Sequence, residues 1–142
     1  MSVRTGGKRM DRQAKGTFEV KRSMEPGCDM GDGIEAGHFR FDKTFAGPLS
    51  ATSVVHMLAV GTPVEGSAGY VAIERVRGAL DGRDGTFFFQ HHGVMERGAP
   101  TLMLNVVPDS ATDALTGLRG RMAIDIVDGQ HFYTFDYTLG DA

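Results

Sequence analysis

The chain has 142 residues, of which 41% are hydrophobic and 23% charged, so it fits one globular domain with its own core. A net charge of -3 excludes the basic surface that nucleic-acid binding needs, and no segment approaches the run of about 20 apolar residues that spans a bilayer. We therefore expect neither a nucleic-acid partner nor membrane association. The single cysteine, Cys28, excludes an intrachain disulfide and favours a reducing compartment, so the expected location is the cytoplasm.

Residues 1–14 are basic and carry no strand or helix pattern, so we predict a flexible tail without chemistry there. Residues 15–142 are predicted to form a single β-barrel domain. The 20 glycines fall mostly between apolar runs, which indicates that they mark turns.

Eight segments rich in Val, Ile, Phe, Tyr and Thr are predicted to be strands. In chain order they span residues 16–22, 38–46, 50–60, 68–80, 85–95, 101–107, 118–127 and 130–139. Glycine-containing connections between them suit tight turns, whereas residues 23–37 are predicted to form a long loop. The one helix signal runs from Ser110 to Leu115, with Ser110 as the candidate N-cap, and covers at most two turns.

This pattern predicts an all-β protein with almost no helix. Short connections make neighbouring strands antiparallel, and eight of them favour a closed up-and-down β-barrel, the lipocalin-like arrangement, because closure leaves no free edge. A two-sheet sandwich is the alternative. The last hairpin supports the barrel, because a turn at residues 128–129 gathers apolar and aromatic side chains on one face. That face holds Met122, Ile124, Ile126, His131, Tyr133, Phe135, Tyr137 and Leu139.

The hairpin of residues 66–93 places a carboxylate and an imidazole on the same inward face. Side chains alternate along a strand, so Glu74 and His91 share this face with Tyr70, Phe87 and Phe89. The same alternation turns Lys43 inward and leaves only Phe88 and Phe132 outside among the aromatic residues. Buried polar groups need partners, so this face is where function is expected.

Three segments resemble a known family of bacterial proteins. They read RFDKTFAGPLSATS, VEGSAGYVAIERVRGALDGRDGTFFFQHHGVMERG and LTGLRGRMAIDIVDGQHFYTFDYTL. The chain is similar, over roughly residues 15 to 139, to the uncharacterised family called domain of unknown function 3224. The resemblance implies a compact barrel similar to that of plant allene oxide cyclases. It implies no established activity and no catalytic residue.

Two interpretations of the inward polar residues remain open. Glu74 and His91 are candidate catalytic residues as a general acid/base pair, or they form a buried hydrogen-bonded pair that fixes strand register. Lys43 either binds a carboxylate or carbonyl, or pairs with Glu74. Tyr70, Tyr133 and Tyr137 either present hydroxyls to a ligand or bind neighbouring groups. The predicted ligand-binding set is therefore Lys43, Tyr70, Glu74, His91, Tyr133 and Tyr137.

No metal and no cofactor are predicted. His91 and His92 are adjacent on one strand and point to opposite faces, so they do not share an ion; if a metal were bound, His91, His131 and Glu74 would be its ligands. Residues 81–85 begin like a calcium loop, but the twelfth position is His92 instead of Glu. No phosphate-binding glycine loop lies between a strand and a helix.

The outer face of the same hairpin carries Val71, Ile73 and Phe88, which predicts self-association unless the loop 23–37 covers them. Three hypotheses follow for function. The first is a barrel that binds a small apolar molecule bearing a carbonyl or carboxylate. The second is an isomerase or cyclase that uses Glu74 or His91 for proton transfer. The third is a structural or interaction module with a filled core.

Overall fold

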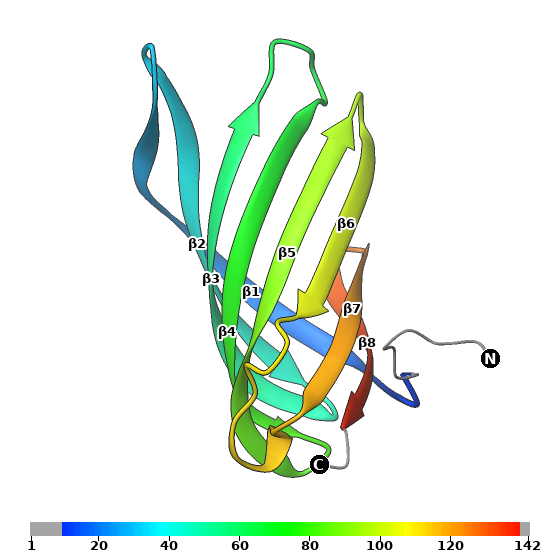
Figure 1. The fold of residues 1–142 in the computed structure, drawn as a ribbon. Coiled ribbons are helices and arrows are strands. Elements are labelled where there is room, and N and C mark those ends of the chain that lie inside the picture. Colours follow the sequence, from blue (N-terminus) through cyan, green and yellow to red (C-terminus); the bar gives the residue numbers. More distant parts are fainter. Residues whose placement is uncertain (1–9, 140–142) are drawn as a thin grey trace, which may run out of the picture.

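The computed structural model describes residues 10–139 as an eight-stranded antiparallel β-barrel (Figure 1). The strands are β1 (Arg12–Gly31), β2 (Ile34–Ala46), β3 (Leu49–Gly61), β4 (Ala68–Leu80), β5 (Arg83–Glu96), β6 (Ala99–Val106), β7 (Leu118–Val127) and β8 (Gln130–Leu139). One 3-10 turn, η1 (Asp113–Leu115), precedes β7. Among the described residues no helix is long and apolar enough to cross a membrane.

Each strand pairs with the next, and pairing of β1 with β8 closes the barrel. The seam between β6 and β7 is weak, because Asn105 and Arg121 form its one strand pair. β7 pairs fully with β8 from Leu118 to Val127, so the barrel wall separates along β6 and β7 toward one end. Figure 1 shows these two strands diverging.

The two ends of the barrel differ in how they are filled. At the closed end, the β2–β3 and β4–β5 turns and η1 surround a dense core of alternating inward side chains. The core includes Phe18, Phe45, Leu49, Val76, Leu80, Phe87, Phe89, Leu115, Leu118, Tyr133, Phe135 and Tyr137. Gly85 lets the η1 segment pack closely against β5, since a Cβ there would lie 3.2 Å from the Leu115 side chain. The open end carries the β1–β2, β3–β4, β5–β6 and β7–β8 turns.

The predicted loop over residues 23–37 is wrong. β1 runs on to Gly31 and β2 begins at Ile34, so the segment forms a two-stranded arm with its turn at Asp32 and Gly33. Both turn residues have positive φ, of 55° and 78°, which Asp and Gly tolerate well. The arm pairs with β3 no further than Gly37, so it extends beyond the barrel wall.

The predicted tail of residues 1–14 is too long at its C-terminal side. β1 begins at Arg12, and Ala14 pairs with Phe135 and is buried in the core. Residues 1–9 lie outside the described part of the chain. A stretch as short as Arg12–Ala14, with two polar residues and one small apolar residue, does not reveal a strand until β8 is there to pair with it.

Two further side chains differ from the predictions, and a third, Phe88, keeps its predicted direction. Ser110 does not cap a helix; its hydroxyl accepts the Phe88 N–H at 3.0 Å, and Thr112 occupies the N-cap position of the 3-10 turn. Ile126 follows the inward alternation but is 64% exposed, because it lies where β7 ends at the open end. Phe88 faces outward as predicted, yet it is half-buried because residues 107–112 bond to β5 beside it.

Candidate functional site

Four consecutive strands bring one polar cluster into the barrel. The Glu74 carboxylate on β4 accepts hydrogen bonds from the Ser53 hydroxyl at 2.5 Å, from His91 Nε2 at 2.7 Å and from Lys43 Nζ at 3.3 Å. Register explains the arrangement, because Lys43 of β2 lies opposite Ser53 of β3, while His91 of β5 lies diagonally across from Glu74. The structure therefore joins Lys43, Glu74 and His91 as one network.

Glu74 is ionised within this network. Burial would raise the pKa of its carboxyl group, but the Lys43 ammonium and the hydrogen bonds from His91 and Ser53 outweigh it and hold the pKa below the usual value of 4.5. The side chain is completely buried. An ionised carboxylate with a lowered pKa is a weak base and supplies no proton, so proton transfer by Glu74 itself loses support.

The ionised carboxylate also decides which imidazole nitrogen carries a proton. A carboxylate only accepts hydrogen bonds, so His91 Nε2 is the donor in the contact with Glu74. His91 Nδ1 makes no hydrogen bond in the described part of the chain, and no buried side-chain nitrogen or oxygen there lacks a partner. Nδ1 is therefore accessible from the barrel interior.

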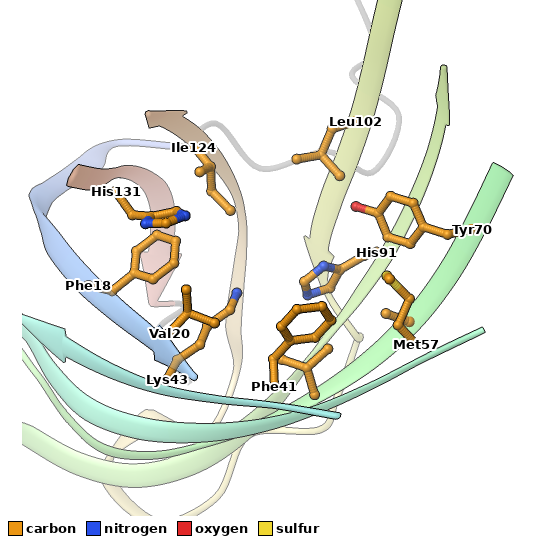
Figure 2. Close-up of a pocket in the computed structure, with 12 residues that line it drawn as sticks. Phe18, Val20, Phe41, Lys43, Met57, Tyr70, His91, Leu102, Ile124 and His131 are labelled. Atoms are coloured by element: carbon orange, nitrogen blue, oxygen red, sulfur yellow. The ribbon is translucent and has the colours of Figure 1, made fainter. Parts of the chain in front are cut away.

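The polar cluster forms part of the wall of a cavity at the open end of the barrel (Figure 2). The cavity has a volume of about 190 Å³. Its walls are mainly apolar: Phe18, Val20, Phe41, Val55, Met57, Ala72, Leu102 and Ile124 join Lys43, Tyr70, His91 and His131. Leu102 on β6 and Ile124 on β7 flank the weak seam, so the cavity reaches the side of the barrel as well as its end.

Lys43 and Tyr70 supply hydrogen-bond donors to this cavity. The Lys43 ammonium lies 4.9 Å from the Phe18 ring centroid and donates one hydrogen bond within residues 10–139, to Glu74, which leaves donor capacity on the cavity side. Burial, with a smaller contribution from Glu74, raises the pKa of the Tyr70 hydroxyl, which stays protonated at neutral pH. Figure 2 shows this hydroxyl turned toward the cavity from β4, on the opposite side from His131.

Gly93 makes room for the Tyr70 ring and was not identified from the sequence. The two residues are strand partners, and a Cβ at position 93 would lie 3.0 Å from Tyr70 Cζ. Any side chain at this position would displace the ring. A glycine in a strand indicates a close approach of another group, but the sequence alone does not say which one.

Tyr133 and Tyr137 are not brought to the cavity. The Tyr133 hydroxyl donates to the Ala46 carbonyl at 3.0 Å and accepts the Leu49 N–H at 3.0 Å, so it holds the β2–β3 turn. The Tyr137 hydroxyl donates to the Asp81 carboxylate in the β4–β5 turn, and burial together with Asp81 raises the pKa of Tyr137 to about 12. Both hydroxyls hold turns at the closed end.

Extending the alternation to β3 identifies one further inward polar residue of the network. Ser53 occupies an inward position of β3 between Ala51 and Val55, which marks it as a buried polar residue. His131, whose inward direction the alternation predicts, lines the cavity, and its ring lies tilted beside Phe18 at a centroid distance of 5.0 Å. Alternation gave the direction of these side chains, but their partners depend on strand register.

Histidine pairing across strands was also missed. His38 Nε2 and His56 Nδ1 lie 2.8 Å apart on the outer face. Within residues 10–139, no group of three or more His, Cys, Asp or Glu side chains is placed to hold a metal ion. The two histidines therefore form a hydrogen-bonded pair.

The profile of DUF3224, a protein family of unknown function, matches residues 14–137, almost the whole barrel. The chain belongs to the DUF3224 family. A solved structure of a DUF3224 protein of unknown function from Shewanella oneidensis MR-1 is similar to it, with 47% sequence identity and a TM-score of 0.85. That match covers 91% of this chain and 98% of the Shewanella chain. No curated protein matches this DUF3224 chain. The comparisons thus support the barrel and the family and assign no activity.

Proposed function

We propose that this DUF3224 barrel binds a compact, largely apolar molecule that bears a carbonyl or carboxylate group. The proposal rests on one observation: an apolar cavity of about 190 Å³ with the ammonium of Lys43 and the hydroxyl of Tyr70 on its wall. These groups donate hydrogen bonds, and the one carboxylate beside them, Glu74, is already occupied by three donors. A ligand with an acceptor group therefore fits the site better than a ligand with a donor group.

The cavity volume limits the size of the ligand. Drug-sized ligands occupy pockets of roughly 300–1,000 Å³, whereas an apolar cavity of about 150 Å³ holds benzene. A cavity of about 190 Å³ corresponds to one small ring with a short substituent. We further propose that binding takes place in the cytoplasm, since the single Cys28 suits a reducing compartment.

Small aromatic probes test this function. Acetophenone and benzoate carry acceptors, and ethylbenzene, of similar size, has none. One hydrogen bond to a charged donor contributes about 1.5–3 kcal/mol, so titration calorimetry should give the better acceptor probe at least about tenfold tighter binding than ethylbenzene. Tyr70→Phe, which removes a hydroxyl without a buried partner, should weaken the acceptor probe and leave ethylbenzene unchanged. Equal binding of all three probes, or none, would refute the proposal.

Proton transfer is the second candidate function, and His91 carries it. The ring is oriented by Glu74 through Nε2, and Nδ1 is accessible from the cavity, which is how a general base is positioned. Deuterium exchange at the methyl group of acetophenone, followed by NMR, is the direct assay. Catalysed exchange that His91→Gln abolishes would support an enzyme; exchange at the buffer rate would leave the protein as a binding barrel.

A further inference from the structure

The outer face of the barrel carries an apolar band opposite the cavity wall. Six exposed side chains, which we call the outer band, lie on four neighbouring strands: Leu58, Val60, Val71, Ile73, Val94 and Met103. Register places them side by side, since Leu58 pairs with Val71, Val71 with His92 and His92 with Met103. A hollow of about 600 Å³ over Leu58, Val71 and Ile73 of this band is bordered on the arm side by Cys28.

The outer band matches in area the largest apolar patches of small proteins, which are often functional. With strands about 4.8 Å apart and a rise of about 3.4 Å per residue, it covers on the order of 400 Å² in plan. The largest apolar patch of a monomer is typically about 300–600 Å² and often functional. Val71 and Ile73 at its centre are 54% and 48% exposed.

Charges surround the band without entering it. No Lys, Arg, Asp or Glu faces outward between its members, so the band can meet an identical band without electrostatic repulsion. The next outward position on β4 toward the closed end is Arg75, followed by Arg77. The next on β5 toward the open end is Glu96. All three are exposed, and none takes part in an ion pair within residues 10–139.

The positions of these charges fit a two-fold axis. In the β4–β5 register, Ala72 lies level with His91. Arg77 follows Ala72 toward the closed end by as many residues as Glu96 follows His91 toward the open end. The two charges therefore lie equally far from this level, one toward each end of the barrel. A two-fold axis that lies in the plane between the two sheets, perpendicular to the strands at the level of Ala72, sets Val71 and Ile73 of the two copies face to face with antiparallel strands. It then brings Arg77 of each copy level with Glu96 of the other.

We infer that the outer band is the interface of a two-fold homodimer, in which Ile73 and Val71 form the buried centre and Arg77 pairs with Glu96 across the axis. A partner of different sequence would need both a matching apolar face and this charge order, whereas a second copy of the chain has them already. The inference is independent of what the cavity binds.

Sedimentation velocity with native mass spectrometry on the full chain tests it. The wild type should be a dimer. Ile73→Asp should weaken the dimer by at least about 30-fold, as expected for a residue at the centre of an interface. Ile126→Asp is the matched control, because it places the same charge at an exposed isoleucine of β7 outside the band, and it should leave the dimer intact. Circular dichroism melting confirms that both variants fold.

Exchanging the charges tests the two-fold arrangement itself. Arg77→Glu and Glu96→Arg should each weaken the dimer, and the double variant should restore it. A monomeric wild type, or a dimer that Ile73→Asp does not weaken, would overturn the interface. A double variant as weak as the single variants would overturn the proposed axis.

Discussion

Glu74 accepts hydrogen bonds from three side chains while it is shielded from water on every side. A buried charge is tolerated only when its partners are in place, and the loss of one partner leaves the other unpaired. Lys43 depends on Glu74 in this way, because Glu74 is its one ion-pair partner within residues 10–139. The network is therefore structural as well as part of the cavity wall.

The first prediction concerns Glu74→Gln. The variant keeps the size of the side chain but leaves the Lys43 ammonium buried without a counter-charge, which we expect to destabilise the fold by about 3 kcal/mol. For a chain of this size, that corresponds to a fall in melting temperature of roughly 10 °C, measurable by calorimetry. Glu19→Gln, at an exposed position of β1, is the control and should melt like the wild type. An unchanged melting temperature for Glu74→Gln would show that the carboxylate does not hold the fold together.

The second prediction follows from the lowered pKa of Glu74. Its pKa in the folded state lies below 4.5, the value it regains on unfolding, so the unfolded chain takes up the proton first as the pH falls. The stability that Glu74 contributes is complete above this value and is lost as the pH falls through the folded pKa. The free energies of unfolding of the wild type and of Glu74→Gln, measured with urea, should therefore converge as the pH falls below about 4.5. If the difference in unfolding free energy between the two proteins stays constant down to about pH 3, Glu74 is not ionised in the folded protein.

At the scale of elements, the arm formed by the ends of β1 and β2 contrasts with the barrel wall. Cys28 to Gly31 and Ile34 to Ala36 pair only with each other, and a two-stranded hairpin alone is marginally stable in water. Exposed Met24, Met30 and Ile34 contribute nothing to the core. The arm is held in place by its continuity with the wall.

The third prediction is that the arm opens far more often than the wall. Hydrogen exchange followed by NMR or mass spectrometry should show amides of residues 28–36 exchanging orders of magnitude faster than those of residues 70–78 in β4. The β7–β8 turn at Asp128 and Gly129 serves as a reference for fast exchange. Protection of the arm equal to that of β4 would mean that another surface, such as a second copy, covers it.

The arm also marks where sequence patterns stop being informative. Alternation predicted the bounds of β3 to β8 to within two residues because one face of each strand meets the core, as with Phe87 and Phe89. Apart from the buried Ala36, residues 23–37 are exposed or half-buried on both faces, and a β-bulge near Pro26 interrupts the register, so the alternation there is too weak to be read. The direction of Glu74 and His91 was predictable for the same reason that the strands were.

At the scale of the whole molecule, the barrel is filled at one end and hollow at the other. The inward tyrosines have different partners in the two halves. The hydroxyls of Tyr133 and Tyr137 donate hydrogen bonds to turn residues at the closed end, while Tyr70 faces the cavity. Alternation alone assigns all three to the interior and does not distinguish the halves. The difference depends on where along the barrel axis each residue lies, which strand tilt and register decide.

The fourth prediction uses one substitution in both halves. Ala72 lines the cavity and Ala51 lies in the filled core, where the backbone of Gly78 approaches it closely. Ala72→Leu should fill part of the cavity, abolish binding of acetophenone and benzoate, and leave the melting temperature unchanged or higher. Ala51→Leu should overpack the core, lower stability by about 1–3 kcal/mol, and leave probe binding to the remaining folded protein intact. Equal destabilisation by both substitutions would mean that the open end has no room for a ligand, and the binding function would fail with it.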